Sequence, residues 1–519
     1  MRTMRTIRFV AVAAATFLAL SHLAWASGEE EGAADQVPEI ELMFGGWVNQ
    51  PTDENDPFRA YLNETFGVDI RMNNTAEFNN EILTRFATND PPDIVKFSAG
   101  AIGEAFLTQL YDEGFLLEDW NEHASSLPTW MEYMDDYAED YLTRDGKLTA
   151  LSTAGPPNIW GFQIRKDWLA NLGLEIPTTA DELMSVARAF TYDDPDGNGK
   201  DDTWGLTSAG NGQGVGEIRN LKLMWGPTDF YIAGGQASHY VVDGTEHAFL
   251  DFMRAAVAEG VIEPNWYTIA WNERKAPLFQ GVLGTAWYPG VLVTEFVNEG
   301  GRTVEESVDL WTHLPMPKGR PEGGRLAAPR FFDRMFTLSR QATEDPVKLE
   351  RILALIDGVA YPNPGYYAIR WGVDIDKGVR HELPGGYTAI IAGPGTERYR
   401  SVENFLGAAD WGNWMSTRAD FTIFTPATSA DDLPATVFSE IELNNGALAE
   451  ETYAPDAYFL HLDQSVVGEL NTLAAEFEYK YIIGETDDYE GFMNEWLAAG
   501  GQDLLDEATR QFKALGMIR

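Results

Sequence analysis

The segment from Phe162 to Leu206 constrains the fold more than any other part of the chain. It reads F-x-x-R-K-D-W-L-x-x-L-G-L-x-x-P-T-T-x-D-E-L and, after a short gap, D-P-D-G-N-G-K-D-D-T-W-G-L. The first residues predict the end of a strand, and a helix is expected over Lys166–Gly173 because glycine commonly ends helices. The Thr178–Thr179 pair predicts the cap of a second helix, whose first turn carries the acidic residues Asp181–Glu182.

That second helix leads into an acidic loop with the spacing of a calcium loop. Asp194, Asp196 and Asn198 occupy positions 1, 3 and 5, the Lys200 carbonyl falls at position 7, and Asp202 falls at position 9. Hard oxygen ligands at alternating positions allow a short loop to wrap one cation. Position 12 holds a glycine where an EF-hand has a bidentate glutamate. The loop predicts a structural calcium ion, and a solvated Asp/Gly/Asn turn is the alternative.

Strand and helix patterns alternate in the first hundred residues after the N-terminal segment. Short apolar strands are expected over 40–44, 68–72 and from Asp93, with helices over 56–66 and 77–88 between them. This alternation favours a parallel α/β sheet. Ligands bind at the carboxyl ends of the strands in such sheets, which places candidate ligand contacts in the loops that follow them.

Several further motifs recur along the chain in a specific order. They are Pro92-Asp93-Ile94-Val95, G-V-I-E-P-N-W over 260–266, the strand over 281–287, the segment over 358–366 and the C-terminal segment from Ile483 to Gly501. Together with the segment over 162–206, they resemble extracellular solute-binding protein family 1. Within that family the chain is most similar to the long oligosaccharide-binding proteins of ABC importers, including the alginate-binding ones.

The resemblance implies an α/β protein with the type II periplasmic-binding-protein fold, in which two α/β lobes close by a hinge on an interlobe ligand cleft. It also implies that relatives can use a carboxylate at position 10 of the calcium loop, where this chain has Thr203. The predicted metal ligands are therefore Asp194, Asp196, Asn198, Lys200, Asp202 and Thr203.

The expected domain organisation follows from crossings between the lobes near residues 154–160 and 329–332 and from a third crossing near residues 372–390. It comprises a signal peptide over 1–26, a flexible acidic linker over 27–37, the first part of lobe 1 over 38–155, the first part of lobe 2 over 156–327 with the calcium-like loop at 194–205, the return to lobe 1 over 328–380, and the remainder of lobe 2 with C-terminal helices over 381–519.

The N-terminal segment predicts export. Arg2, Arg5 and Arg8 precede an apolar run, and Ala24-Trp25-Ala26 matches a cleavage site. The sequence has no cysteine, which excludes disulfides and an N-terminal lipidated cysteine. We expect a periplasmic protein that is secreted by its signal peptide and is not lipid-anchored. The formal net charge of −44 argues against nucleic acid and anionic membranes as partners.

Aromatic residues at strand ends and in polar loops are the candidates for ligand contact, because sugar rings stack on aromatic planes. Sixteen tryptophans are present, and those in amphipathic stretches are expected in the core. Polar side chains beside the same loops could hydrogen-bond sugar hydroxyl groups. The predicted ligand-binding residues are Trp47, Asn49, Gln50, Ser98, Trp160, Trp225, Asp229, Trp271, Trp287, Tyr288, Arg330 and Trp371.

Catalytic motifs are missing from the sequence. It contains no P-loop, no G-x-S-x-G and no H-E-x-x-H, and its seven histidines lack metal-ligand spacing. The resemblance therefore implies a non-enzymatic, monomeric receptor that binds a sugar or oligosaccharide by lobe closure and delivers it to an ABC transporter permease. Two alternatives stay open, a secreted glycoside hydrolase and a receptor for a non-sugar solute.

Overall fold

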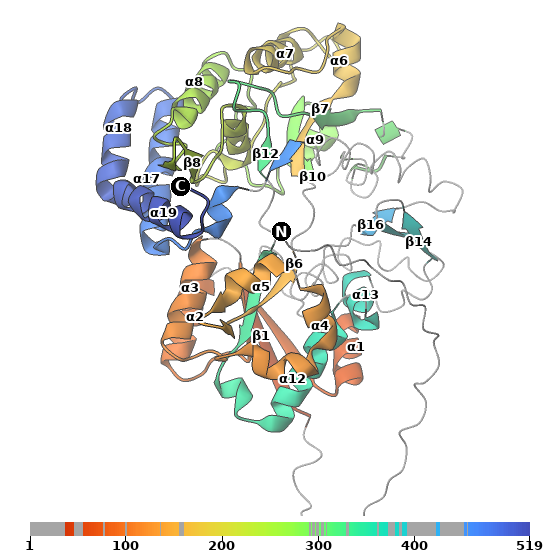
Figure 1. The fold of residues 1–519 in the computed structure, drawn as a ribbon. Coiled ribbons are helices and arrows are strands. Elements are labelled where there is room, and N and C mark those ends of the chain that lie inside the picture. Colours follow the sequence, from red (N-terminus) through yellow and green to blue (C-terminus); the bar gives the residue numbers. More distant parts are fainter. Residues whose placement is uncertain are drawn as a thin grey trace, which may run out of the picture. The chain divides into compact units, whose positions relative to one another are not determined.

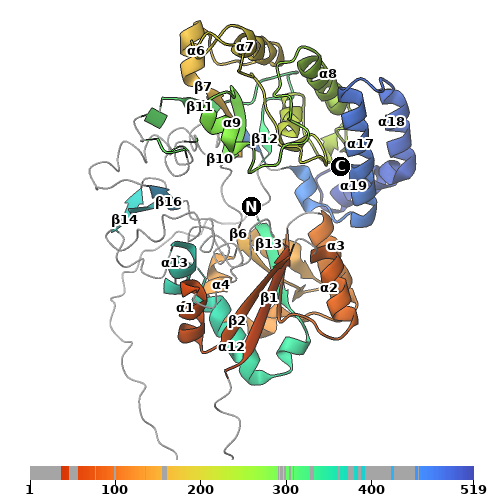
Figure 2. The same cartoon turned by 180° about the vertical axis from the view of Figure 1, so that it is seen from behind.

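The fold was analysed in a computed structural model of the chain, drawn in Figure 1 and from behind in Figure 2. It describes residues 37–45, 56–75, 78–98, 101–134, 136–154, 160–289, 311–327, 332–360, 363–371, 379–383, 387–391, 422–425, 451–453 and 455–518, with a few positions between 291 and 310. The predicted signal peptide lies outside the described residues, as do residues 27–36 of the predicted linker.

The N-terminal third builds most of a five-stranded sheet with the strand order β2-β1-β3-β13-β6. Strands β1, β2 and β3 are parallel, as the sequence predicts. Strand β13 is antiparallel to both of its neighbours, β3 and β6. The carboxyl ends of β1, β3 and β6 therefore share one edge with the start of β13. The strands are β1 (Glu39–Gly45), β2 (Asp69–Thr75), β3 (Ile94–Ser98), β6 (Leu151–Ala154) and β13 (Phe332–Leu338).

Helices pack on both sides of this sheet and enclose a first hydrophobic core. Its members come from residues 40–151 and 335–369. Trp120 and Trp130 are fully buried in it, each with its ring edge-on to Phe336 of β13. The helices of this part are α1 (Pro57–Phe66), α2 (Phe78–Ala87), α3 (Ala101–Asp112), η1 (Trp120–Ser126), α4 (Pro128–Tyr133), α5 (Asp136–Leu142), η3 (Gln341–Thr343), α12 (Pro346–Gly358) and α13 (Pro364–Trp371).

The helices predicted from the segment over 162–206 are confirmed. Helix α6 (Lys166–Leu172) ends at Gly173, which has the left-handed φ of 65° that favours glycine. Helix α7 (Ala180–Tyr192) begins with a capping box, in which the Thr179 hydroxyl accepts from the Glu182 N–H and the Glu182 carboxylate accepts from the Thr179 N–H. Local sequence signals are sufficient to set these boundaries.

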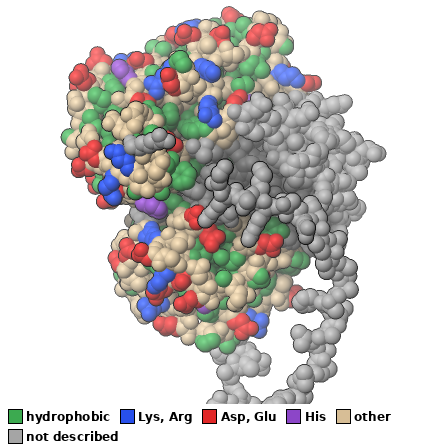
Figure 3. All heavy atoms as spheres, in the orientation of Figure 1, with side chains coloured by type: hydrophobic (Ala, Val, Ile, Leu, Met, Phe, Trp, Pro, Cys, Tyr) green, Lys and Arg blue, Asp and Glu red, His purple; other side chains and the backbone are tan. Residues whose placement is uncertain are grey.

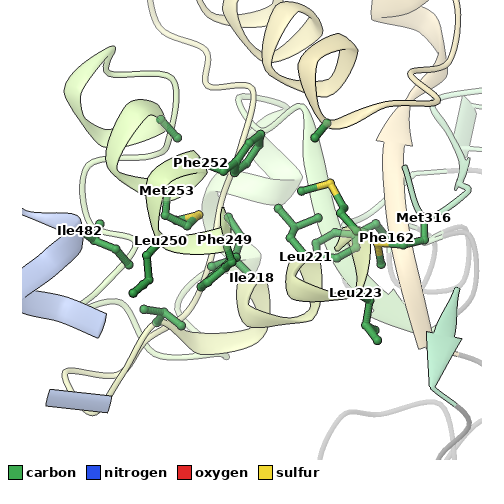
Figure 4. Close-up of a cluster of buried hydrophobic side chains, with 14 of the residues drawn as sticks. Phe162, Ile218, Leu221, Leu223, Phe249, Leu250, Phe252, Met253, Met316 and Ile482 are labelled. Carbon is green, nitrogen blue, oxygen red and sulfur yellow. The ribbon is translucent and has the colours of Figure 1, made fainter. Parts of the chain in front are cut away.

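A second sheet has the strand order β10-β7-β11 and is antiparallel throughout. Its strands are β7 (Trp160–Arg165), β10 (Thr285–Pro289) and β11 (Trp311–Leu314). One face, which includes Phe162, packs on a second core with η2 (Gly216–Met224) and α8 (Thr245–Ala258). Figure 4 shows Phe162, Leu221, Phe249 and Leu250 in this core. The other face, which includes Tyr288, belongs to a third cluster with Leu278 of α9 (Lys275–Gln280).

C-terminal helices complete the second core, to which Leu470, Phe492 and Phe512 belong. They are α17 (Gln464–Ile482), α18 (Tyr489–Trp496) and α19 (Gln502–Ala514), with η7 (Asp456–Phe459) and the π-helical turn η8 (Leu497–Gly501). Residues from 162–326 and 457–518 thus share one core although 130 residues of sequence separate them. The predicted domain limits stay a prediction.

The remaining strands form small sheets. They are the hairpins β4 (Thr143–Arg144) with β5 (Lys147–Leu148) and β8 (Tyr231–Ala233) with β9 (Gln236–Ser238), the pair β12 (Leu326–Ala327) with β17 (Thr452–Tyr453), and the sheet of β14 (Val379–Leu383), β15 (Tyr387–Ile391) and β16 (Thr422–Thr425). Acidic side chains are scattered over the face drawn in Figure 3 rather than gathered in one patch. Among the described helices, none has the length and apolar character needed to cross a membrane.

Candidate functional site

The shared edge of the five-stranded sheet holds one of the predicted ligand-binding positions that the structure describes. Ser98 is the last residue of β3 and lies opposite Arg334 of β13. Trp371 is the last residue of α13. Trp47, Asn49, Gln50 and Arg330 lie outside the described residues. For this edge the backbone places the strand ends where the sequence expects them, and the ligand contacts stay a prediction.

Three predicted residues meet in an aromatic cluster at one end of the second sheet. The rings of Trp271 and Tyr288 are stacked with centroids 5.2 Å apart and an interplanar angle of 23°. The Trp160 ring lies 5.7 Å from Trp271 at an angle of 58°. Trp160 begins β7, Tyr288 lies near the end of β10, and Trp271 precedes α9. These three elements lie together in Figures 1 and 2. We name Trp160, Trp271 and Tyr288 the aromatic cluster.

A buried arginine supports the aromatic cluster. The Arg274 guanidinium carbon lies 4.1 Å from the ring centroid of Trp271 and 5.6 Å from that of Tyr288. Its charge is paired with Glu217, and it donates a hydrogen bond of 3.2 Å to the Trp287 carbonyl. Burial lowers the pKa of Arg274 to about 10. Arg274 is not among the residues predicted from the sequence. The only local feature that links it to the cluster is its position three residues after Trp271.

The other described candidates lie away from the cluster. Trp287 neighbours Tyr288 on β10 and so points to the opposite face, where its ring is edge-on to Phe162 at 4.9 Å. Trp225 packs against Phe252 with centroids 5.8 Å apart. Asp229 is exposed, and its carboxylate accepts a 2.7 Å hydrogen bond from the Phe230 N–H.

A cavity of about 670 Å³ lies at the opposite edge of the five-stranded sheet, near the starts of β1 and β3. Its basic side chains already have acidic partners: Arg85 with Glu41 at 2.6 Å, and Lys348 with Asp93 at 2.7 Å. Since it lies away from the carboxyl ends of the strands, we do not assign the ligand to it.

In the acidic loop, the side chain of Asn198 links the carboxylates of Asp196 and Asp202. The Asn198 side-chain amide donates to Asp196 Oδ2 at 2.8 Å and to Asp202 Oδ1 at 3.1 Å. One carboxylate oxygen of Asp194 accepts from the Gly199 N–H at 3.0 Å, and the other is buried without a hydrogen-bond partner. A cation could satisfy that unpaired oxygen, so the residues of the loop fit a calcium ion.

Two further observations concern the metal ligands predicted in this loop. The Thr203 hydroxyl is buried and donates to the Phe190 carbonyl at 2.7 Å, which leaves its oxygen lone pairs available to an acceptor role. Within the part of the chain that the structure describes, no three His, Asp or Glu side chains form an assembled metal site. The loop offers Asp194, Asp196, Asn198, the Lys200 carbonyl and Asp202 as ligands, and the predicted role of Thr203 stays a prediction.

Several known proteins are similar to this chain in sequence. No protein-family model matches it. The polygalacturonan/rhamnogalacturonan-binding protein YtcQ of Bacillus subtilis is 26% identical over 399 residues, which cover 73% of this chain and 75% of YtcQ. The lipoprotein LipO of the same organism is 23% identical over 377 residues, which cover 68% of each chain.

Three solved structures show the same architecture. An HMO binding ABC-transporter associated solute binding protein of Bifidobacterium longum infantis has a TM-score of 0.66 at 15% identity. The alginate-binding protein AlgQ2 without calcium ion has a TM-score of 0.62 at 15% identity. An EF-hand mutant of FusA of Streptococcus pneumoniae, in complex with fructo-nystose, has a TM-score of 0.61 at 14% identity. Each similarity covers 92% of this chain and 99% of the solved chain.

The chain has the fold of the extracellular solute-binding proteins. The predicted α/β periplasmic-binding-protein fold is confirmed by these structures. The resemblance to solute-binding proteins of sugar ABC importers, predicted from the order of motifs, is confirmed by relatives and structures alike.

Proposed function

We propose that this protein is the substrate-binding protein of an ABC-type carbohydrate importer. The observation that carries the proposal is the aromatic cluster, in which the partly exposed rings of Trp160 and Trp271 pack around the buried Tyr288 ring at the end of a sheet in a solute-binding fold. Aromatic rings provide large contact areas at small entropic cost, which suits the apolar faces of sugar rings. The polygalacturonan ligand of YtcQ and the fructo-nystose bound to FusA support a carbohydrate as the ligand class.

The proposed mechanism is binding without chemistry. A sugar or oligosaccharide that contacts both lobes shifts the population toward a closed form, because it binds that form more tightly. The closed form then delivers the ligand to a membrane permease. We place this activity in the periplasm, carried out by a monomer without a lipid anchor, and the predicted contacts at Trp47, Asn49, Gln50, Ser98, Arg330 and Trp371 stay part of the proposal.

Replacing Trp271 by Ala is expected to weaken sugar binding because it removes the central ring of the aromatic cluster. Loss of one stacking face costs about 1–3 kcal/mol, by analogy with base–aromatic stacking. This corresponds to a roughly 5- to 150-fold higher dissociation constant. A panel of oligosaccharides is first screened with the wild type by thermal shift, and the strongest ligand is then titrated by calorimetry.

Tyr192→Ala is the matched control, since Tyr192 is an exposed aromatic residue on α7. It should leave the dissociation constant unchanged, and circular dichroism must show that both variants fold. Unaltered oligosaccharide after incubation supports a receptor, whereas hydrolysis products indicate a glycoside hydrolase. If a peptide or another non-sugar solute alone raises the melting temperature, the ligand class is wrong.

We further propose that the loop over 194–202 holds a structural calcium ion. The buried, unpartnered oxygen of Asp194 and the convergence of Asp196 and Asp202 on Asn198 support it. An ion bound there would neutralise these carboxylates and hold the loop between α7 and the following strand-like segment in one conformation.

Removal of calcium by a chelator is expected to lower the melting temperature. Calcium at a hundredfold excess over its dissociation constant adds about 2.7 kcal/mol to the free energy of unfolding. Asp196→Ala should abolish the effect of the chelator, whereas Asp201→Asn, at position 8 of the loop, should retain it. A wild-type protein that contains no calcium by elemental analysis and ignores the chelator would show that the loop is a solvated turn.

A further inference from the structure

Two buried polar side chains of the second sheet have polar atoms without a hydrogen-bond partner. Both polar atoms of the Gln163 side chain lack a hydrogen-bond partner, and this residue is 0% exposed. The same holds for Nδ1 of His313, which is 4% exposed. An unsatisfied buried polar group costs about 1–3 kcal/mol, so a group left in this state points to a polar molecule that binds there.

The register of the second sheet places these two side chains side by side. Gln163 on the central strand β7 pairs with His313 on β11 and with Ala286 on β10. Directly paired residues in an antiparallel sheet point to the same face, so the amide and the imidazole share one face. We name Gln163 and His313 the polar row.

The polar row is one step away from Tyr288 of the aromatic cluster, on the same face of the sheet. The next row toward the Trp160 end consists of Gly161 and Tyr288, which are paired with each other. Two residues along a strand span about 7 Å, which is comparable to the length of one sugar ring. Gly161 has no side chain to separate the Tyr288 ring from the Gln163 amide, and glycine within a strand often marks a close approach of a ligand.

The charged groups near the polar row are already paired. Arg165 on the same face binds Asp167 with an Nε–Oδ1 distance of 2.7 Å. Arg274 is paired with Glu217 beneath the aromatic cluster. His313 Nε2 lies 3.3 Å from a carboxylate oxygen of Glu451. The unpartnered atoms of the polar row therefore belong to an amide and an imidazole, next to a carboxylate.

We propose that Gln163 and His313 hydrogen-bond neighbouring hydroxyl groups of a sugar ring stacked on the aromatic cluster, so that this subsite accepts a neutral sugar residue and rejects a uronate. The inference rests on the proposed carbohydrate-binding function. A primary amide donates and accepts at once, which matches two adjacent hydroxyl groups. A uronate carboxylate at this position would lie next to the Glu451 carboxylate, which accepts from or pairs with His313 Nε2 at 3.3 Å and repels a second negative charge.

Gln163→Leu tests the inference directly. The variant keeps the side-chain volume and removes both polar atoms. It should raise the dissociation constant for a neutral oligosaccharide at least about tenfold, the effect of losing hydrogen bonds to the ligand. The melting temperature without ligand should be unchanged or higher, because no buried polar group is left unsatisfied. Gln280→Leu, on an exposed position of α9, is the control and should change neither value.

A deoxy-sugar series separates a ligand contact from a structural role. The probes are the neutral oligosaccharide that best stabilises the wild type, its monodeoxy analogues, and oligogalacturonate. One deoxy analogue should bind the wild type about tenfold more weakly than the parent sugar and should bind the Gln163→Leu variant as well as the parent does. If Gln163→Leu does not fold, Gln163→Met provides the same comparison.

Three results would overturn the inference. The first result is that folded Gln163→Leu binds the sugar with wild-type affinity while Trp271→Ala binds it weakly. This would mean that buried water satisfies the polar row, and the proposed function would stand. Binding of oligogalacturonate that depends on Gln163 would overturn the neutral specificity. If no sugar binds the wild type, the proposed function itself fails.

Discussion

Replacing Lys222 by Met is expected to lower the free energy of unfolding by about 3–5 kcal/mol, because it leaves two buried carboxyl groups, of which Glu478 is ionised at pH 7, without their cationic partner. Lys222 Nζ lies 2.6 Å from Glu246 Oε2 and 2.6 Å from Glu478 Oε1. The three side chains are at most 5% exposed. They come from η2, the first turn of α8 and α17, so one ammonium group joins three elements of the second core.

Urea denaturation at pH 7 measures this effect. Lys166→Met is the matched control, since Lys166 and its partner Asp309 are both exposed and their ion pair contributes about 1 kcal/mol or less. The penalty of Lys222→Met should shrink at pH 5, where a buried carboxylate is neutralised by a proton. A loss as small as that of Lys166→Met would mean that the buried ion pairs contribute little.

The pH dependence of stability is expected to change when Glu246 is replaced by Gln. Burial raises the pKa of Glu246 to about 8, although the Lys222 charge opposes the shift. A raised pKa in the folded state means that the folded protein binds the proton more tightly than the unfolded chain. The resulting stabilisation is fully present below about pH 4.5 and is lost as the pH rises toward 8.

Two neighbouring groups titrate in the opposite sense. Burial and the Lys222 charge lower the pKa of His239 to about 3, so its contribution to stability is lost as the pH falls below about 6.5. Burial acts to raise the pKa of Glu478, but the Lys222 and Arg219 charges outweigh it and lower that pKa, so its contribution is lost only below about pH 4.5. The difference between wild type and variant isolates Glu246 from both groups.

Glu246→Gln should therefore have the same free energy of unfolding as the wild type near pH 5. At pH 8 its free energy of unfolding should be about 2–4 kcal/mol higher, because the wild type loses up to about 1.4 kcal/mol per pH unit over this range. Urea denaturation of both proteins from pH 5 to pH 8 measures this difference. Glu259→Gln, at the exposed end of α8, should run parallel to the wild type. A constant difference between Glu246→Gln and wild type would show that Glu246 is ionised throughout this range.

Local signals in the sequence determined the secondary structure around the candidate sites. The cap at Thr179 and the stop at Gly173 each depend on residues within one helical turn, and both helices were predicted correctly. The alternation of strands and helices predicted the parallel arrangement of β1, β2 and β3. The order of motifs also predicted the solute-binding fold, because these motifs are spread along the whole chain.

Tertiary structure alone decided which side chains meet. Trp160 and Tyr288 are 128 residues apart in sequence, and only the pairing of β7 with β10 brings them together while it turns Trp287 to the other face. Lys222 and Glu478 are 256 residues apart. Polar residues such as Gln163, Glu246 and Arg274 have no local mark of burial, because the hydrophobic pattern of a sequence predicts them at the surface. Their burial follows from long-range strand register and helix packing, which no short segment of the sequence specifies.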